Sequence, residues 1–134
     1  MTLAELRTDV VIIACAISAG IHGALVGDHF DEGAGPGVGF VVATVLLAAL
    51  AVALTRRPAQ LVLASAALVF AGLLASYALT VTTGLPVLHP ERESVDALAL
   101  ATKAVEAIGL VTVTTLLRRP RLSVALLEAK GTST

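Results

Sequence analysis

The chain has 134 residues, enough for one domain, of which 57% are hydrophobic and only 14% are charged. Soluble domains carry roughly 25% charged residues, so this composition excludes a water-soluble globular protein and predicts a single transmembrane domain over residues 1–134. The net charge of −1 provides no basic surface for nucleic acid, and the single cysteine, Cys15, excludes an intrachain disulfide.

Four apolar segments follow one another along the chain, each long enough to cross a bilayer as a helix. A hydrocarbon core about 30 Å thick needs roughly 20 helical residues. The predicted spans cover residues 10–27, 37–55, 59–83 and 94–117, and breaks containing Gly or Pro separate them. The predicted fold class is therefore all-α, a polytopic transmembrane four-helix bundle. Residues 118–134 are too short and too charged to span, so this tail is either a frayed segment or a short interfacial helix.

The distribution of Lys and Arg predicts the orientation, because cytoplasmic loops are enriched in these residues. The other side of the predicted membrane carries Arg92 and two acidic loops, at residues 28–36 and 84–93. We therefore expect a multi-pass protein of the plasma membrane, surrounded by lipid, with its N- and C-termini in the cytoplasm and both acidic loops outside. The basic residues on the predicted cytoplasmic side are Arg7, Arg56, Arg57, Arg118, Arg119, Arg121 and Lys130.

The outer end of the first span and the loop after it gather several of the chain's scarce polar residues. His22 lies about 8 Å below the predicted outer surface, at 1.5 Å of helix per residue. His29 follows seven residues later and points the same way, and Glu32 shares that face if the helix continues past Gly27. These residues predict a polar site that opens outward.

The fourth span contributes an ionisable pair at similar depth, Lys103 and Glu106, which are i,i+3 neighbours. A charge inside the membrane costs a few kcal/mol, so both side chains should face the bundle interior and each other. Tyr77, in the outer half of the third span, joins them as a candidate proton-carrying or ion-pairing group. The alternative is structural: an ion pair that ties the fourth span to the bundle, with His22 hydrogen-bonded to Tyr77 or Ser18.

Imidazole and carboxylate groups together suit a divalent metal ion. Their spacing here matches no defined ligand motif such as HExxH. Haem is less favoured, because His22 and His29 lie about 10 Å apart on one helix and cannot take opposite axial positions on one iron. No nucleophile set is readable, so the sequence leans against an enzyme. The candidate metal ligands are His22, His29, Glu32, Glu106 and His89.

Two stretches of the chain resemble a set of known sequences. The first is "IHGALVGDHFDEG…G…F" at residues 21–40, and the second is "TTGLP…ESVDALALATKAVEAIG" at residues 82–109. In these stretches the chain resembles small, uncharacterised four-span membrane proteins of actinobacterial-like, high-GC bacteria. The resemblance implies no activity. It singles out a set of residues: His22, His29, Glu32 and Glu106.

The leading hypothesis is a non-enzymatic integral membrane protein whose outward-facing intramembrane His/Glu site binds a metal ion or carries protons. A structural or accessory subunit of a larger membrane complex is one alternative, with the polar residues serving as interhelical hydrogen bonds. A small transporter or proton channel is another, and it would need a homo-oligomer because the inner halves of the second and third spans are almost entirely apolar. Small residues such as Gly20 and Gly27 permit close packing within the bundle or between two copies.

Overall fold

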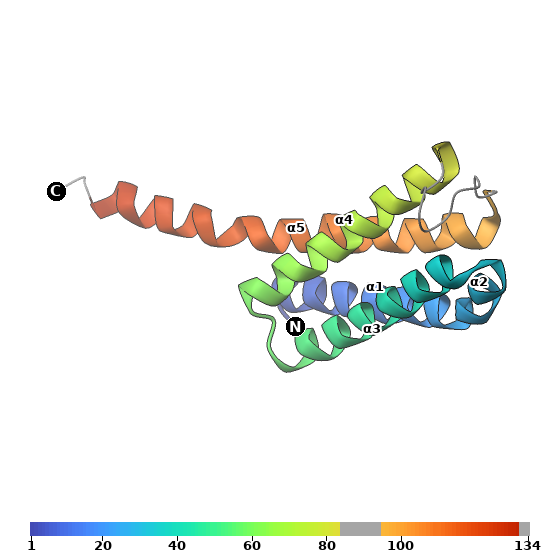
Figure 1. The fold of residues 1–134 in the computed structure, drawn as a ribbon. Coiled ribbons are helices and arrows are strands. Elements are labelled where there is room, and N and C mark those ends of the chain that lie inside the picture. Colours follow the sequence, from blue (N-terminus) through green and yellow to red (C-terminus); the bar gives the residue numbers. More distant parts are fainter. Residues whose placement is uncertain (84–94, 132–134) are drawn as a thin grey trace.

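The computed structural model describes residues 1–83 and 95–131, with side chains described as far as Arg118. These residues are helical and include no strand, which confirms the predicted all-α class. Five helices follow one another in the order α1 (Leu3–Ala24), α2 (Val26–Glu32), α3 (Ala34–Arg56), α4 (Gln60–Thr82) and α5 (Ala97–Gly131) (Figure 1).

Helix α1 begins well before the apolar segment predicted to span, because a capping box starts it. Thr2 Oγ1 accepts a hydrogen bond from the Glu5 backbone N–H at 3.2 Å, and Glu5 Oε2 accepts one from the Thr2 N–H at 2.6 Å. At the other end, Leu25 adopts φ −92° and ψ 0° and turns the chain into α2. The two helices meet at a bend of 47°, so the first predicted span is a broken helix.

Two aromatic contacts hold α2 on α3. The Phe30 ring fills the space where a Cβ atom at Gly37 would lie, so the two helices approach closely there. The His29 imidazole stacks on the Phe40 ring, with 3.5 Å between the ring centroids. Between the helices, Gly33 has φ 155°, a conformation that favours glycine. These contacts direct α2 against α3 and account for the bend that ends α1.

Three helical segments are long and apolar enough to cross a membrane: α3, α4 and Ala97–Arg118 of α5. The bent pair of α1 and α2 passes the same test when it is taken as one broken span. The described residues therefore contain three or four candidate spans, as in a multi-pass membrane protein. The boundaries differ by only a few residues from the predicted spans at 37–55, 59–83 and 94–117.

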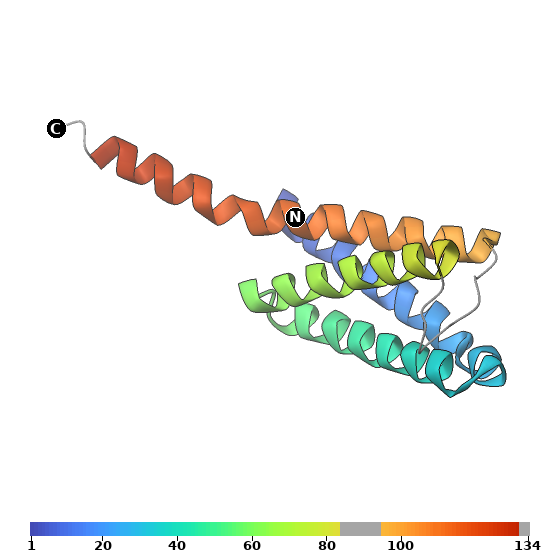
Figure 2. The same ribbon diagram turned by 45° about the horizontal axis from the view of Figure 1, so that its top comes forward.

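Helix α5 is the longest helix, with 35 residues, and it extends past the ends of the other helices (Figures 1 and 2). Its backbone remains helical through residues 118–131, which the sequence leaves open as a frayed segment or a short interfacial helix. The predicted end of the fourth span at residue 117 thus marks the end of the apolar stretch and not the end of a helix.

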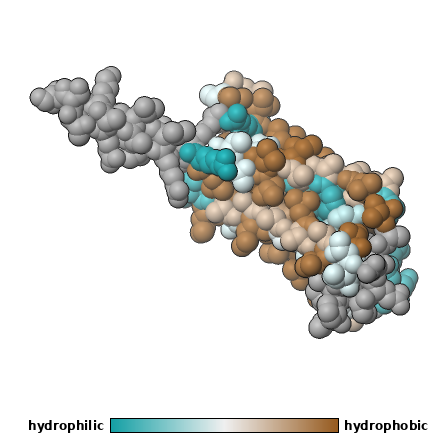
Figure 3. All heavy atoms as spheres, turned by 90° about the horizontal axis from the view of Figure 1, so that it is seen from above, coloured by the Kyte–Doolittle hydropathy of each residue, from teal (hydrophilic) through white to brown (hydrophobic). Residues whose placement is uncertain are grey.

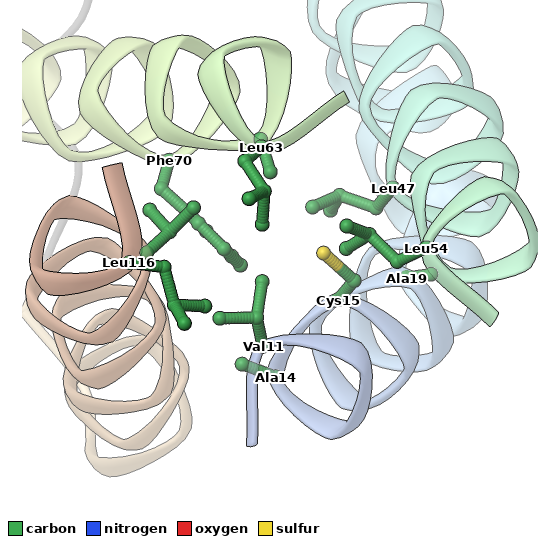
Figure 4. Packing of buried hydrophobic residues seen from close by; sticks show 11 residues of the cluster. Val11, Ala14, Cys15, Ala19, Leu47, Leu54, Leu63, Phe70 and Leu116 are labelled. Carbon is green, nitrogen blue, oxygen red and sulfur yellow. The ribbon is translucent and has the colours of Figure 1, made fainter. Parts of the chain in front are cut away.

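The long helices enclose a shared interior. Helix α1 packs against α3 and α5, and α4 packs against the same two helices (Figures 1 and 2). Gly109 of α5 lets the Phe70 ring of α4 reach its backbone, since a Cβ atom there would lie 2.6 Å from that ring. Side chains of all four long helices converge on one apolar cluster (Figure 4), formed by Val11, Ala14, Cys15, Ala19, Leu47, Leu54, Leu63, Ala66, Phe70, Val113 and Leu116.

The outward faces of the helices carry many large apolar side chains. Val45 of α3, Leu61 and Leu68 of α4, and Val111 of α5 are between 61% and 78% exposed. Figure 3 shows hydrophobic residues spread over the flank of the molecule. Helices that are hydrophobic on every side belong in a large core or in a membrane. At this chain length the exposed apolar surface agrees with a lipid environment.

Candidate functional site

A fully buried carboxylate lies at the contact between α1 and α5. Glu106 of α5 is 0% exposed, and both of its oxygens are occupied. Oε1 accepts a hydrogen bond from the Ser18 hydroxyl of α1 at 2.8 Å, and Oε2 accepts one from the Lys103 ammonium at 2.6 Å. Lys103 reaches Glu106 because the two are i,i+3 neighbours on α5, and Ser18 reaches it because α1 packs on α5.

His22 lies one helical turn beyond Ser18 and faces the same carboxylate. Its Nδ1 donates a hydrogen bond to the Ser18 carbonyl oxygen at 2.9 Å, and its Nε2 lies 3.9 Å from Glu106 Oε1. A carbonyl oxygen only accepts hydrogen bonds, so this contact assigns the hydrogen of the neutral ring to Nδ1. The atom of His22 that can gain a proton is therefore Nε2, which faces Glu106. A protonated His22 would form an ion pair with that carboxylate.

His29, which the sequence places in the loop after the first predicted span, is buried as well. His29 is 8% exposed, and its Nδ1 donates to the Leu25 carbonyl oxygen at 2.9 Å. The Phe40 ring of α3 stacks on His29 and lies tilted against His22, with 5.1 Å between the latter two centroids. Both imidazoles thus pack against one aromatic ring. The bend at Leu25 brings His29 into this contact.

A cavity of about 400 Å³ lies beside these residues, at the α2 end of the molecule. Its lining comes from all five helices and includes Ile21 and His22 of α1, Phe40 of α3, Leu73 and Tyr77 of α4, and Leu98 and Lys103 of α5. We call this part of the molecule the cavity half. Lys103 lines the cavity, and its ammonium lies 5.5 Å from the centroid of the Tyr77 ring. The lining is mostly apolar, and α3 contributes no polar side chain to it.

Exposed carboxylates lie where the cavity reaches the surface. Asp28 and Glu32 of α2 and Asp96 before α5 are all exposed and all line the cavity. Asp96 also caps α5, since its Oδ1 accepts a hydrogen bond from the Ala99 backbone N–H at 2.7 Å. The mouth is therefore acidic, while the deep end carries Lys103 and His22.

The opposite part of the helices holds the buried apolar cluster. The apolar cluster of Figure 4 occupies residues 11–19 of α1, 47–54 of α3, 63–70 of α4 and 113–116 of α5. We call this part the packed half. Each long helix thus contributes one stretch to the cavity half and another to the packed half. Ser18 and Glu106 lie at the boundary, so the buried carboxylate borders the cavity half on one side and hydrocarbon on the other.

The structure brings together four residues that the sequence singles out: His22, Lys103, Glu106 and Tyr77. Glu32 is exposed on α2, and His89 lies outside the described residues. Over residues 1–83 and 95–118, no group of three or more His, Cys, Asp or Glu side chains could hold a metal ion. The described part of the chain therefore gives the predicted metal site no support.

Sequence reasoning missed two residues of the site. Ser18 enters it only as a partner for His22, whereas its hydroxyl donates to Glu106, 88 positions away. Its place one turn before His22 on the same face is the signal that could have included it. Phe40 gives no signal at all, because an aromatic residue in an apolar span is unremarkable until the histidines are found packed on its ring.

The chain matches no known protein family, no characterised protein and no solved structure.

Proposed function

We propose that the protein crosses the plasma membrane four times, with the broken α1–α2 pair as its first span and both termini in the cytoplasm. Charge supports this topology. The α2 end carries Asp28, Asp31 and Glu32, whereas α3 leads from there to Arg56 and Arg57 at the other end of the molecule. Cytoplasmic loops are enriched in Lys and Arg, so the α2 end and the cavity beside it would face outward.

Cysteine labelling tests the orientation. In a Cys15→Ala background, an Asp31→Cys variant should react with a membrane-impermeant maleimide on intact cells. An Arg57→Cys variant should react only after the cells are lysed. Cys15 itself is 0% exposed, so the wild-type chain is the unlabelled control. The reverse pattern would invert the topology, and with it the outward cavity.

We propose that the protein is non-enzymatic and carries a proton at an intramembrane site made of His22 and Glu106. The observation that supports this function is the buried Glu106 carboxylate, which Ser18 and Lys103 hold while His22 Nε2 faces it from 3.9 Å. Ionisable groups inside a membrane are rare and costly, and they often mark proton or ion pathways. The two groups lie close enough to form an ion pair when His22 is protonated.

The surrounding residues would let protons reach this site from the cavity only. A proton arriving from the cavity can reach His22, which lines it, and then the pair formed with Glu106. Beyond Glu106 lie the buried apolar side chains of the packed half and the close contact between Phe70 and Gly109. The site would therefore exchange protons with the cavity and not conduct them through a single copy of the chain.

Nitrogen-15 NMR of the histidines tests the function directly, because the chain has only three of them. Neutral His22 should show the tautomer with its hydrogen on Nδ1. In a Glu106→Gln variant the negative charge that faces Nε2 is gone, so His22 should gain its second proton at a lower pH than in wild type.

An Asp9→Asn variant is the matched control, because it makes the same carboxyl-to-amide change at an exposed position of α1. It should leave the His22 titration unchanged. A His22 titration that is the same in wild type and Glu106→Gln would overturn the proposed function. So would a neutral ring with its hydrogen on Nε2.

A further inference from the structure

The cavity has the size and lining of a site for a small organic molecule. Its volume of about 400 Å³ lies within the range of roughly 300–1,000 Å³ for small-ligand sites. Apolar side chains from the four long helices line it, among them Ile21, Phe40, Leu73 and Leu98, and polar groups are fewer. Such a lining suits a ligand with an apolar body and one polar head.

Lys103 is the group best placed to receive that head. Its side chain is 16% exposed and lines the cavity, whereas its partner Glu106 is fully buried behind it. An ammonium group has three donors, and one of them is used by Glu106 at 2.6 Å. An anionic head in the cavity would therefore meet the inner cation from its accessible side.

We propose that the cavity binds a small amphiphilic carboxylic acid, whose carboxylate takes the place of Glu106 on the Lys103 ammonium. This inference rests on the proposed function, in which the His22–Glu106 pair accepts a proton. The acid enters uncharged, its O–H bond breaks, and the proton passes to the Glu106 carboxylate. The products are a ligand carboxylate paired with Lys103 and a neutral Glu106 carboxyl group, so charge and protons balance.

The acidic mouth explains why the neutral form of the ligand enters. Asp28 and Asp96 line the mouth and repel an anion, but an uncharged acid passes them. The lining residues of α3 carry no charge. Binding should strengthen as the pH falls toward the ligand's own pKa, which for a simple carboxylic acid is close to the value of about 4.3 for glutamate. The other titratable groups that face the cavity are His22, His29, Tyr77 and Lys103.

Three probes with one body separate the contributions of the head group: phenylbutyric acid, phenylbutanol and phenylbutylamine. Intrinsic fluorescence reports binding without a label, because the chain has one tyrosine and no tryptophan, and Tyr77 lines the cavity beside Lys103. The acid should change Tyr77 emission saturably in purified protein, more tightly at lower pH. The alcohol and the amine should bind about tenfold more weakly or worse, since they lose a charge-assisted hydrogen bond.

Two variants sharpen the test. In Glu106→Gln a neutral amide replaces the carboxylate, so Lys103 is released and the acid should bind at neutral pH at least as tightly as in wild type. In the double variant Lys103→Met, Glu106→Gln no buried charge is left unpaired, so the bundle should fold and the acid should lose its advantage over the alcohol. Ser65→Ala on α4 is the control; its hydroxyl bonds only to the Leu61 carbonyl oxygen.

The outcomes separate this inference from the proposed function. Tightest binding by the amine would assign the cavity to a cation held by the acidic mouth, and equal binding by the alcohol would show apolar partitioning; either result overturns the inference. If the histidine NMR shows the His22–Glu106 pair and no acid binds, the proposed function stands and the inference fails. If the acid binds through Lys103 but Glu106→Gln leaves the His22 titration unchanged, the proton-carrying function fails.

Discussion

The cavity half and the packed half are built from the same four long helices, yet they are held together by different interactions. In the packed half, close apolar contacts such as Phe70 on Gly109 join α4 to α5. At the boundary of the cavity half, the Ser18 hydroxyl of α1 bonds to the Glu106 carboxylate of α5, which Lys103 also holds. Apolar packing adapts to several neighbours, whereas a buried carboxylate tolerates only the arrangement that satisfies both of its oxygens.

Both kinds of contact stabilise helices in a lipid bilayer. An apolar side chain gains little free energy when it moves from lipid to a helix interface, because both surroundings are apolar. Close packing and polar contacts must therefore hold membrane helices together. Gly109 provides the close packing in one half, and Glu106 provides the polar contact in the other. Substitutions at each position therefore measure how much either interaction contributes.

The largest effect is expected in the cavity half, from Lys103→Met. The change leaves Glu106 buried without its cation, and breaking a buried ion pair in this way costs about 3–5 kcal/mol. The free energy of unfolding, measured in bicelles, should fall by that amount. Adding Glu106→Gln should restore most of the loss, because the charge is then gone. A double variant as unstable as the single one would contradict the ion-pair explanation.

A smaller effect is expected in the packed half, from Gly109→Ala. The new Cβ atom would lie 2.6 Å from the Phe70 ring and 3.1 Å from Ala14 Cβ, so α4 and α1 must both shift. Overpacking of this kind costs about 1–3 kcal/mol. Gly72→Ala is the matched control, since nothing lies within 4 Å of a Cβ atom there. If both variants unfold alike, close packing at Gly109 does not stabilise this half.

The smallest effect is expected outside both halves, at the start of α1. Thr2→Ala removes one side of the capping box, and loss of such a cap costs about 1 kcal/mol. Thr2→Ser keeps the hydroxyl and should restore the stability. Neither change should alter the Tyr77 fluorescence response to phenylbutyric acid, because the cap lies far from the cavity. A changed response would show that the cavity half depends on the N-terminal cap of α1.

Several features of the site could be read from the sequence because they are local. Lys103 and Glu106 are three residues apart, so a helix alone brings them together. Tyr77 and His22 were found because a polar residue at membrane depth stands out in an apolar segment. The contact of Ser18 with Glu106 could not be read, since it depends on how α1 and α5 are rotated and shifted against each other.

Hydropathy and length by themselves determined the all-α class, the approximate boundaries of the apolar segments and the gathering of polar groups in one half of the molecule. These are properties of consecutive residues, because any helix that crosses a bilayer needs about 20 mostly apolar residues in a row. Only the tertiary structure decided that α1 breaks at Leu25, that Phe40 packs against His22 and His29, and that the metal-ligand set does not assemble among the described residues. The physical reason is that such contacts follow from the packing of separate helices, which no periodicity within one helix encodes.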